Sequence, residues 1–187
     1  VCVGFDKSDA ILGLIDDGYI LATMAQNPDV MGYEGVKAAV AALKGENLGG
    51  AVTDTGVSVL KASSSAAPTG DVKPAGDYKI ALITMDSIDQ HWITLKEGAE
   101  KVAKELGVEL VFMAPNTKDD AQQIEQVNNA VASGCKAIIV AANGPDAISS
   151  ALKEAEAAGV KIVYVDSPAN VPGEATFSTD NTAAGKT

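Results

Sequence analysis

The chain has 187 residues, of which 47% are hydrophobic and 21% charged, a balance typical of a folded globular domain with one sizeable core or two small ones. Its 25 acidic and 14 basic side chains give a formal net charge of −11 at pH 7, which argues against a nucleic-acid partner because phosphate backbones are repelled. No apolar run approaches the roughly 20 residues that a membrane-spanning helix needs.

The first part of the chain, residues 1–61, alternates apolar strands with helices. Ser8 and Asp9 are candidate caps for the start of its first helix, and Gly18 and Gly45 are candidate ends for its two helices. We expect strands at 1–5, 20–25 and 52–60, and helices at 10–16 and 32–43.

Residues 62–77 are rich in Ser, Ala, Pro and Gly. Such a composition holds too little apolar surface to pack against a core. We therefore expect a flexible linker between the first part of the chain and the part that follows.

The last part, residues 78–187, repeats the strand–helix alternation with a clearer rhythm. We expect strands at 78–84, 108–113, 137–142, 161–165 and 175–178, and helices at 93–106, 120–133, 146–158 and 180–185. The strands are continuously apolar, as in a sheet covered on both faces, and the links are short. Such alternation predicts right-handed βαβ units, so the fold class is α/β with a parallel, doubly wound sheet.

In a sheet of this kind the ligand lies at the carboxyl ends of the strands. Asp6, Asp86, Asp89 and Asp166 all follow expected strands. Three interpretations of these acids are open. They could include a carboxylate pair for acid–base chemistry, form a group that accepts hydrogen bonds from ligand hydroxyls, or be surface acids that cap helices. No catalytic motif accompanies them, so we do not expect an enzyme.

His91 and Trp92, the only His and the only Trp, stand together between an expected strand and an expected helix. An indole face suits the apolar face of a sugar ring or an aromatic ligand, and its N–H can donate; the alternative is a Trp packed under a loop. A lone His does not indicate a metal site. We expect no cofactor either, because no Gly-x-Gly-x-x-Gly follows a strand and Asp180 occupies the first glycine position of a phosphate loop.

Several short motifs resemble one known family. Residues 78–187 resemble the amino-terminal part of periplasmic sugar-binding proteins of the ribose-binding type, a type I fold shared with LacI-type repressors, through Ile80-Ala-Leu-Ile, Leu95-Lys-Glu-Gly-Ala, Ala137-Ile-Ile-Val, Pro145-Asp-Ala and Val163-Tyr-Val-Asp. Residues 1–61 resemble the carboxyl end of the same family through Val3-Gly-Phe-Asp, Asp17-Gly, Ala22-Thr-Met-Ala-Gln, Met31-Gly-Tyr and Leu43-Lys-Gly-Glu.

The two parts stand in the reverse of the family's order, so the resemblance implies a circular permutant. It implies four segments: a remnant of the carboxyl-terminal lobe at 1–26, a segment returning to the amino-terminal lobe at 27–61, the linker at 62–77 and the amino-terminal lobe at 78–187. Most of the second lobe has no counterpart here. We expect the missing block to follow Thr187, to be disordered or to come from another chain.

The resemblance implies a solute-binding receptor for a sugar or sugar-like ligand that feeds an ABC permease. In its native context such a receptor would be periplasmic or extracellular, and the linker resembles the spacer after the lipidated Cys of Gram-positive binding lipoproteins. The permuted order suggests an engineered module such as a sensor. The alternative on the same fold is the effector domain of a LacI-type regulator, which predicts a basic helix-turn-helix that is missing here.

The family's binding residues carry over where positions match. They imply a ligand site built from Trp92, His91, Asp89, Asp166, Asp6, Gln26, Asn143 and Asp86. Asn143 and Asp86 are the weaker matches. Ser167 stands where the family's ribose binders have Arg, which argues against simple ribose recognition because a bidentate guanidinium is lost.

Overall fold

The computed structural model describes residues 2–61 and 77–186. The linker expected at 62–77 lies outside the described residues except for Asp77. The strands are β1 (Val3–Phe5), β2 (Ala22–Gln26), β3 (Ala51–Asp54), β4 (Val57–Leu60), β5 (Lys79–Ile83), β6 (Glu109–Met113), β7 (Ala137–Val140), β8 (Lys161–Val165) and β9 (Ala175–Ser178). The helices are α1 (Asp9–Asp16), α2 (Pro28–Leu43), α3 (Gln90–Leu106), α4 (Asp120–Ala132), α5 (Ser149–Ala157) and α6 (Asn181–Ala184).

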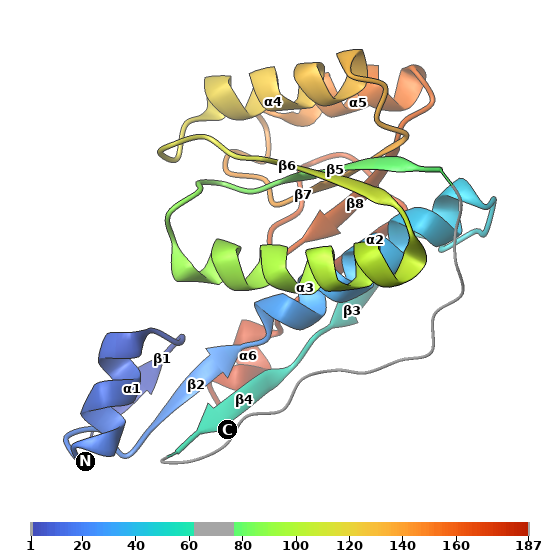
Figure 1. The fold of residues 1–187 in the computed structure, drawn as a ribbon. Helices are drawn as coiled ribbons and strands as arrows, with labels where there is room; N and C mark the ends of the chain where they lie inside the picture. The colour runs from blue at the N-terminus through green and yellow to red at the C-terminus, as the bar shows by residue number, and fades with distance from the viewer. Residues whose placement is uncertain (1, 62–76, 187) are drawn as a thin grey trace.

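The larger sheet has six strands in the order β3-β9-β8-β7-β5-β6, and every pairing in it is parallel. Helices α2 and α3 cover one face, and α4 and α5 cover the other (Figure 1). This confirms the α/β class and the doubly wound parallel sheet, since βαβ units place helices on both faces.

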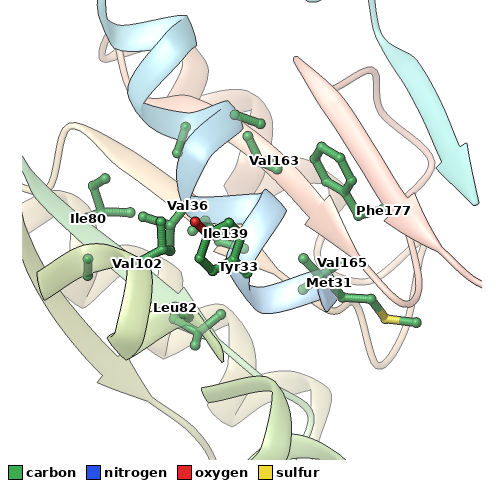
Figure 2. Close-up of a cluster of buried hydrophobic side chains, with 14 of the residues drawn as sticks. Met31, Tyr33, Val36, Ile80, Leu82, Val102, Ile139, Val163, Val165 and Phe177 are labelled. Carbon is green, nitrogen blue, oxygen red and sulfur yellow. The ribbon is translucent and has the colours of Figure 1, made fainter. Parts of the chain in front are cut away.

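The strand side chains divide between two cores, one on each face of the larger sheet. Ile80 and Leu82 of β5 pack beneath α2 and α3, where Figure 2 shows them with Val36. Ala81 and Ile83 of the same strand pack beneath α4 and α5. Alternate residues of a strand point to opposite faces, so a continuously apolar strand is what a doubly covered sheet requires.

The two parts of the chain meet where α2 crosses α3. A Cβ atom added at Gly32 of α2 would lie 2.0 Å from the Leu95 carbonyl oxygen, and one at Gly98 of α3 would lie 2.0 Å from the Asp29 carbonyl oxygen. The backbones therefore touch through two glycines. The two parts of the chain also meet in the larger sheet, where β3 from the first part pairs with β9 from the last.

The single strand expected at 52–60 is two strands in the structure. Gly56 has a φ of 70°, and its N–H donates to Asp54 Oδ1 at 2.8 Å, so a turn separates β3 from β4. Whereas β3 joins the larger sheet, β4 pairs antiparallel with β2 in the smaller sheet, whose order is β1-β2-β4. The segment 27–61 thus divides between the two sheets.

Two helices begin several residues earlier than expected, each for a local reason. α3 begins at Gln90 because Asp89 accepts a hydrogen bond from the His91 backbone N–H at 3.0 Å as its N-cap. His91 and Trp92 therefore lie in the first turn of a helix rather than in a loop. α2 begins at Pro28, a residue suited to the first helical position. None of the helices in residues 2–61 and 77–186 has the length and apolar character needed to cross a membrane.

Candidate ligand-binding cleft

A cavity of about 1100 Å³ lies between the smaller sheet and the carboxyl end of the larger one. Its walls come from both parts of the chain. Six of the eight residues expected at the ligand site line it, namely Asp6, Gln26, Asp89, His91, Trp92 and Asp166. Strands end at this cavity in both sheets, which is where a parallel sheet exposes polar groups to a ligand.

Asp166 is the best-supported acceptor in the cleft. Its Oδ1 lies 3.2 Å from His91 Nε2, and its Oδ2 accepts a hydrogen bond from the Ser167 hydroxyl at 2.7 Å. Burial alone would raise the pKa of Asp166, but His91, Ser167 and the charge of Lys118 outweigh it, and the pKa is held below its ordinary value. The carboxylate is therefore ionised at neutral pH and able to accept hydrogen bonds.

Asp6 lies in the opposite wall and has the opposite shift. Loss of hydration raises its pKa, His91 partly offsets this, and the like charges of Asp89 and Asp166 add to the rise. Asp6 nevertheless stays largely exposed, so solvent weakens these electrostatic interactions.

His91 and Trp92 meet edge to face, with ring centroids 4.7 Å apart and an interplanar angle of 86°. Although His91 Nε2 lies close to Asp166 Oδ1, this buried nitrogen makes no contact of hydrogen-bond geometry with any of the described residues. Trp92 is 4% exposed and belongs to the core beneath α2 and α3. The indole both borders the cleft and packs inside the protein.

The Trp92 indole N–H is not free for a ligand, contrary to expectation. Nε1 donates to Asp86 Oδ2 at 3.2 Å. Asp86 itself is 7% exposed and does not line the cavity. Its carboxylate is used inside the protein, beneath the residues that do line it.

The remaining expected residues are Asn143 and Gln26. Asn143 does not line the cavity: its side-chain amide donates to Asp120, and its backbone N–H donates to Gln123 Oε1 at 2.9 Å. Gln26, at the end of β2, lines the cavity and donates through Nε2 to Asn181 Oδ1 at 2.9 Å.

The cleft also contains polar residues that the sequence analysis missed, among them Lys7, Asn27, Ser58, Gln90 and Lys118. Lys7 and Lys118 each follow a strand, so the rule that ligands lie at strand ends could have found them. Ser58 could not be found, because residues 52–60 read as one strand. In the part of the chain that the structure describes, no three His, Cys, Asp or Glu side chains gather as a metal site would require.

Comparisons with known proteins agree with this architecture. The model of a periplasmic binding protein domain family matches residues 80–187. The chain is 28% identical over 109 residues to the ribose import binding protein of Escherichia coli (strain K12), a match that covers 57% of this chain and 36% of that protein. The chain thus spans about a third of the length of this curated relative.

Two solved structures are similar to the chain. A sugar transporter from Clostridium phytofermentans is 33% identical with a TM-score of 0.54, over 58% of this chain and 41% of that one. The periplasmic component of an ABC-type sugar transport system from Hahella chejuensis is 26% identical with a TM-score of 0.54, over 57% of this chain and 40% of that one.

Proposed function

Since the chain belongs to the periplasmic binding protein family, we propose that it is part of a solute receptor that binds a sugar or sugar-like molecule in the cleft and supplies it to an ABC permease. The observation that carries this proposal is that one cleft gathers Asp6 and Gln26 from one sheet with Asp89, His91 and Asp166 from the other side. Ionised carboxylates accept hydrogen bonds from hydroxyl groups, and an adjacent indole suits a sugar ring.

The receptor makes and breaks no bonds in this proposal. Its relatives are named as import binding proteins or sugar transport components, which favours transport over the LacI-type alternative. Ligand would hold the two sheets closed around the cleft, and the closed form would be the one that the permease recognises.

The site residues remain part of the proposal. We assign ligand hydrogen bonds to Asp6, Asp89, Asp166 and Gln26, with His91 Nε2 as a further polar contact. Trp92 contributes its ring but not its N–H, since Asp86 already accepts that hydrogen. We propose no direct ligand contact for Asn143 or Asp86, because neither lines the cavity.

We further propose that the two parts of the chain stand in a circularly permuted order and that the permuted protein is an engineered module such as a sensor. The close crossing of α2 on α3 and the pairing of β3 with β9 support it, because both join elements from opposite sides of the linker. N-terminal sequencing and the intact mass of the protein from its natural source would test this. Residues 78–186 preceding residues 2–61 there would support permutation, and the printed order would end it.

The domain division and the missing segment are proposals of the same kind. We place 1–26 in the second lobe, and 78–187 with most of 27–61 in the first, with β4 as the exception. β1 has β2 as its one paired neighbour in the described part of the chain, and Val3 and Phe5 are 57% and 46% exposed. Such an edge and such apolar exposure support a further segment or a partner that completes the second lobe.

We also propose a periplasmic or extracellular location, with a lipid anchor in the native protein. The family and its import-protein relatives support the location, and the linker composition is the only support for the anchor. Labelling of the native precursor with radioactive palmitate would test the anchor, and unlabelled protein would end that part of the proposal.

Isothermal titration calorimetry of the purified full chain against neutral pentoses and hexoses tests the function. We expect saturable binding of at least one sugar by the wild type, greatly weakened in Asp166→Asn. Asp17→Asn at the exposed end of α1 is the matched control, because Asp17 lies outside the cleft. A panel that gives no heat with the wild type, or equal affinity in both variants, would overturn the proposal.

A further inference from the structure

The segment from Asp86 to Trp92 contains four residues that line the cleft, Asp89, Gln90, His91 and Trp92, and the Asp86 carboxylate accepts hydrogen bonds from three points along it. Asp86 Oδ1 accepts hydrogen bonds from the Ile88 and Asp89 backbone N–H groups at 2.9 and 2.8 Å. Asp86 Oδ2 accepts the Trp92 indole N–H at 3.2 Å. The same side chain thus holds the turn before α3 with one oxygen and the indole with the other.

The backbone of Asp86 is itself held in place by two buried polar side chains that are linked by hydrogen bonds, those of Thr84 and Gln123. The Thr84 hydroxyl donates to the Asp86 carbonyl oxygen at 2.8 Å, and Thr84 is 0% exposed. Gln123 of α4, also 0% exposed, donates to the Thr84 and Ala141 carbonyl oxygens at 3.1 and 2.8 Å. The side-chain polar atoms of Thr84 and Gln123 all have hydrogen-bond partners, which is the condition under which a buried network fixes one arrangement.

The chemistry of Asp86 cannot be supplied by its closest isostere. Three donors converge on two carboxylate oxygens, and both oxygens of an ionised Asp are acceptors. Asn has one acceptor oxygen and a donor NH₂ group. If the Asn oxygen keeps the two backbone N–H groups, its NH₂ group faces the indole N–H, donor against donor.

The ionisation state agrees with this arrangement. Burial would raise the pKa of Asp86, but the hydrogen bonds from Asp89, Ile88 and Trp92, together with the charge of Lys118, outweigh it and lower the pKa. Asp86 therefore accepts all three hydrogen bonds as a carboxylate at neutral pH.

We propose that Asp86 is a positioning residue that fixes the Trp92 indole and the start of α3, and so sets the wall of the cleft formed by Asp89, His91 and Trp92, without touching the ligand. Thr84 and Gln123 hold Asp86 in place. The effect on ligand affinity rests on the proposed function, but the positioning itself does not, and it can be measured in the ligand-free protein.

The chain has a single Trp, so its indole N–H gives one resonance in a ¹⁵N–¹H NMR spectrum. In the ligand-free wild type we expect this proton at low field, as for a hydrogen bond to a carboxylate, and in slow exchange with water. A resonance at the position of a free indole in fast exchange would overturn the proposal, and this outcome needs no variant to fold.

Asp86→Asn is the informative substitution, with Asp119→Asn as its matched control. Asp119 also caps a helix, α4, through the Gln122 N–H, but contacts no indole, and Asn is as good a cap as Asp. We expect Asp86→Asn to move the indole proton upfield, speed its exchange and shift the Trp emission to longer wavelength. Asp119→Asn should leave all three unchanged. An unchanged indole signal in folded Asp86→Asn would overturn the proposal.

Ligand affinity separates this inference from the proposed function. For any sugar that binds the wild type, we expect about tenfold weaker binding by Asp86→Asn, the effect of one lost hydrogen bond. In a Trp92→Phe background the same substitution should change affinity far less, because the indole it positions is gone. An equal loss in both backgrounds would overturn the positioning role, whereas a wild type that binds no sugar would overturn only the proposed function.

Discussion

Asp6 and Asp166 occupy equivalent positions in the two sheets. Each follows the last residue of a parallel strand and has a left-handed backbone, with φ of 65° and 60°. Each donates its backbone N–H across to the neighbouring strand, Asp6 to the Met24 carbonyl at 2.7 Å and Asp166 to the Phe177 carbonyl at 2.8 Å. The two walls of the cleft therefore end in the same local structure, and each presents one carboxylate.

Asp6→Asn and Asp166→Asn should each weaken ligand binding while the fold is retained. Asn tolerates a left-handed backbone nearly as well as Asp does, so the strand ends should keep their shape. Each substitution removes a charged acceptor, for which about 1.5–3 kcal/mol, or roughly a ten- to hundredfold loss of affinity, is expected. Calorimetry measures the affinity and circular dichroism checks the fold. Affinity within twofold of the wild type would contradict the assignment for that residue.

The same two substitutions should change the stability of the ligand-free protein in opposite directions. The lowered pKa of Asp166 adds stability above the ordinary value near 3.8, and this stability is lost as pH falls through the lowered pKa. The raised pKa of Asp6 reduces stability at neutral pH, and the penalty is relieved as pH falls through the raised pKa.

At pH 7 we therefore expect Asp166→Asn to lower the free energy of unfolding, by about 1 kcal/mol, and Asp6→Asn to raise it slightly, since Asp6 is largely exposed. The Asp6→Asn difference from the wild type should shrink as the pH falls through the raised pKa of Asp6, above 3.8. The Asp166→Asn difference should shrink as the pH falls below 3.8. Urea unfolding at pH 7, 5 and 3.5 measures them. Destabilisation by Asp6→Asn at pH 7 would contradict the electrostatic description of the cleft.

The close contact of α2 with α3, which joins the two parts of the chain, leads to a prediction about stability. Gly32→Ala should destabilise the protein by about 1–3 kcal/mol, because its Cβ would lie 2.0 Å from the Leu95 carbonyl oxygen and the helices would have to separate. Thermal unfolding should show a drop of several degrees in Tm.

Gly13→Ala in α1 is the matched control. Gly13 lies within an exposed helix, and an added Cβ would meet nothing within 4 Å. Ala there should raise stability by about 0.5–1 kcal/mol through helix propensity alone. If both substitutions had the same sign, close helix contact would not explain the effect at Gly32.

Sequence alone located two acidic cleft residues that directly follow strands. Asp6 and Asp166 each end an uninterrupted apolar run, and carboxyl ends of parallel strands face the ligand side of a sheet. The larger sheet was predicted for the same reason, since β5, β7 and β8 are apolar without alternation and are covered on both faces.

Other features depend on contacts that no local pattern contains. Asp86 was expected at the ligand because it follows a strand, yet three donors from the next six residues enclose its carboxylate. Helix capping was one of the open interpretations of Asp89, but the residue was assigned to the ligand site and the helix was expected to begin only at residue 93, so the start of α3 was placed too late. The turn at Asp54-Thr55-Gly56 was missed because residues 52–60 were interpreted as one strand, although an Asp two residues before a Gly is a turn signal.

Asn27 should hold together two of the segments that connect the two sheets, the β2–α2 connection and the β3–β4 turn. Its Nδ2 donates to the Thr55 carbonyl at 3.0 Å, and its Oδ1 accepts from the Ser58 hydroxyl at 2.8 Å, so it joins the β2–α2 crossing to the β3–β4 turn. Asn27→Ala removes both hydrogen bonds and should cost about 1–3 kcal/mol. Asn27→Asp keeps the Ser58 contact but places a carboxylate against the Thr55 carbonyl.

Hydrogen exchange should therefore speed up at the backbone amides of β4 in both variants, while the β7 amides in the middle of the larger sheet stay protected. Equal acceleration in β4 and β7 would indicate global destabilisation instead, and unchanged exchange in β4 would show that Asn27 does not couple the crossings.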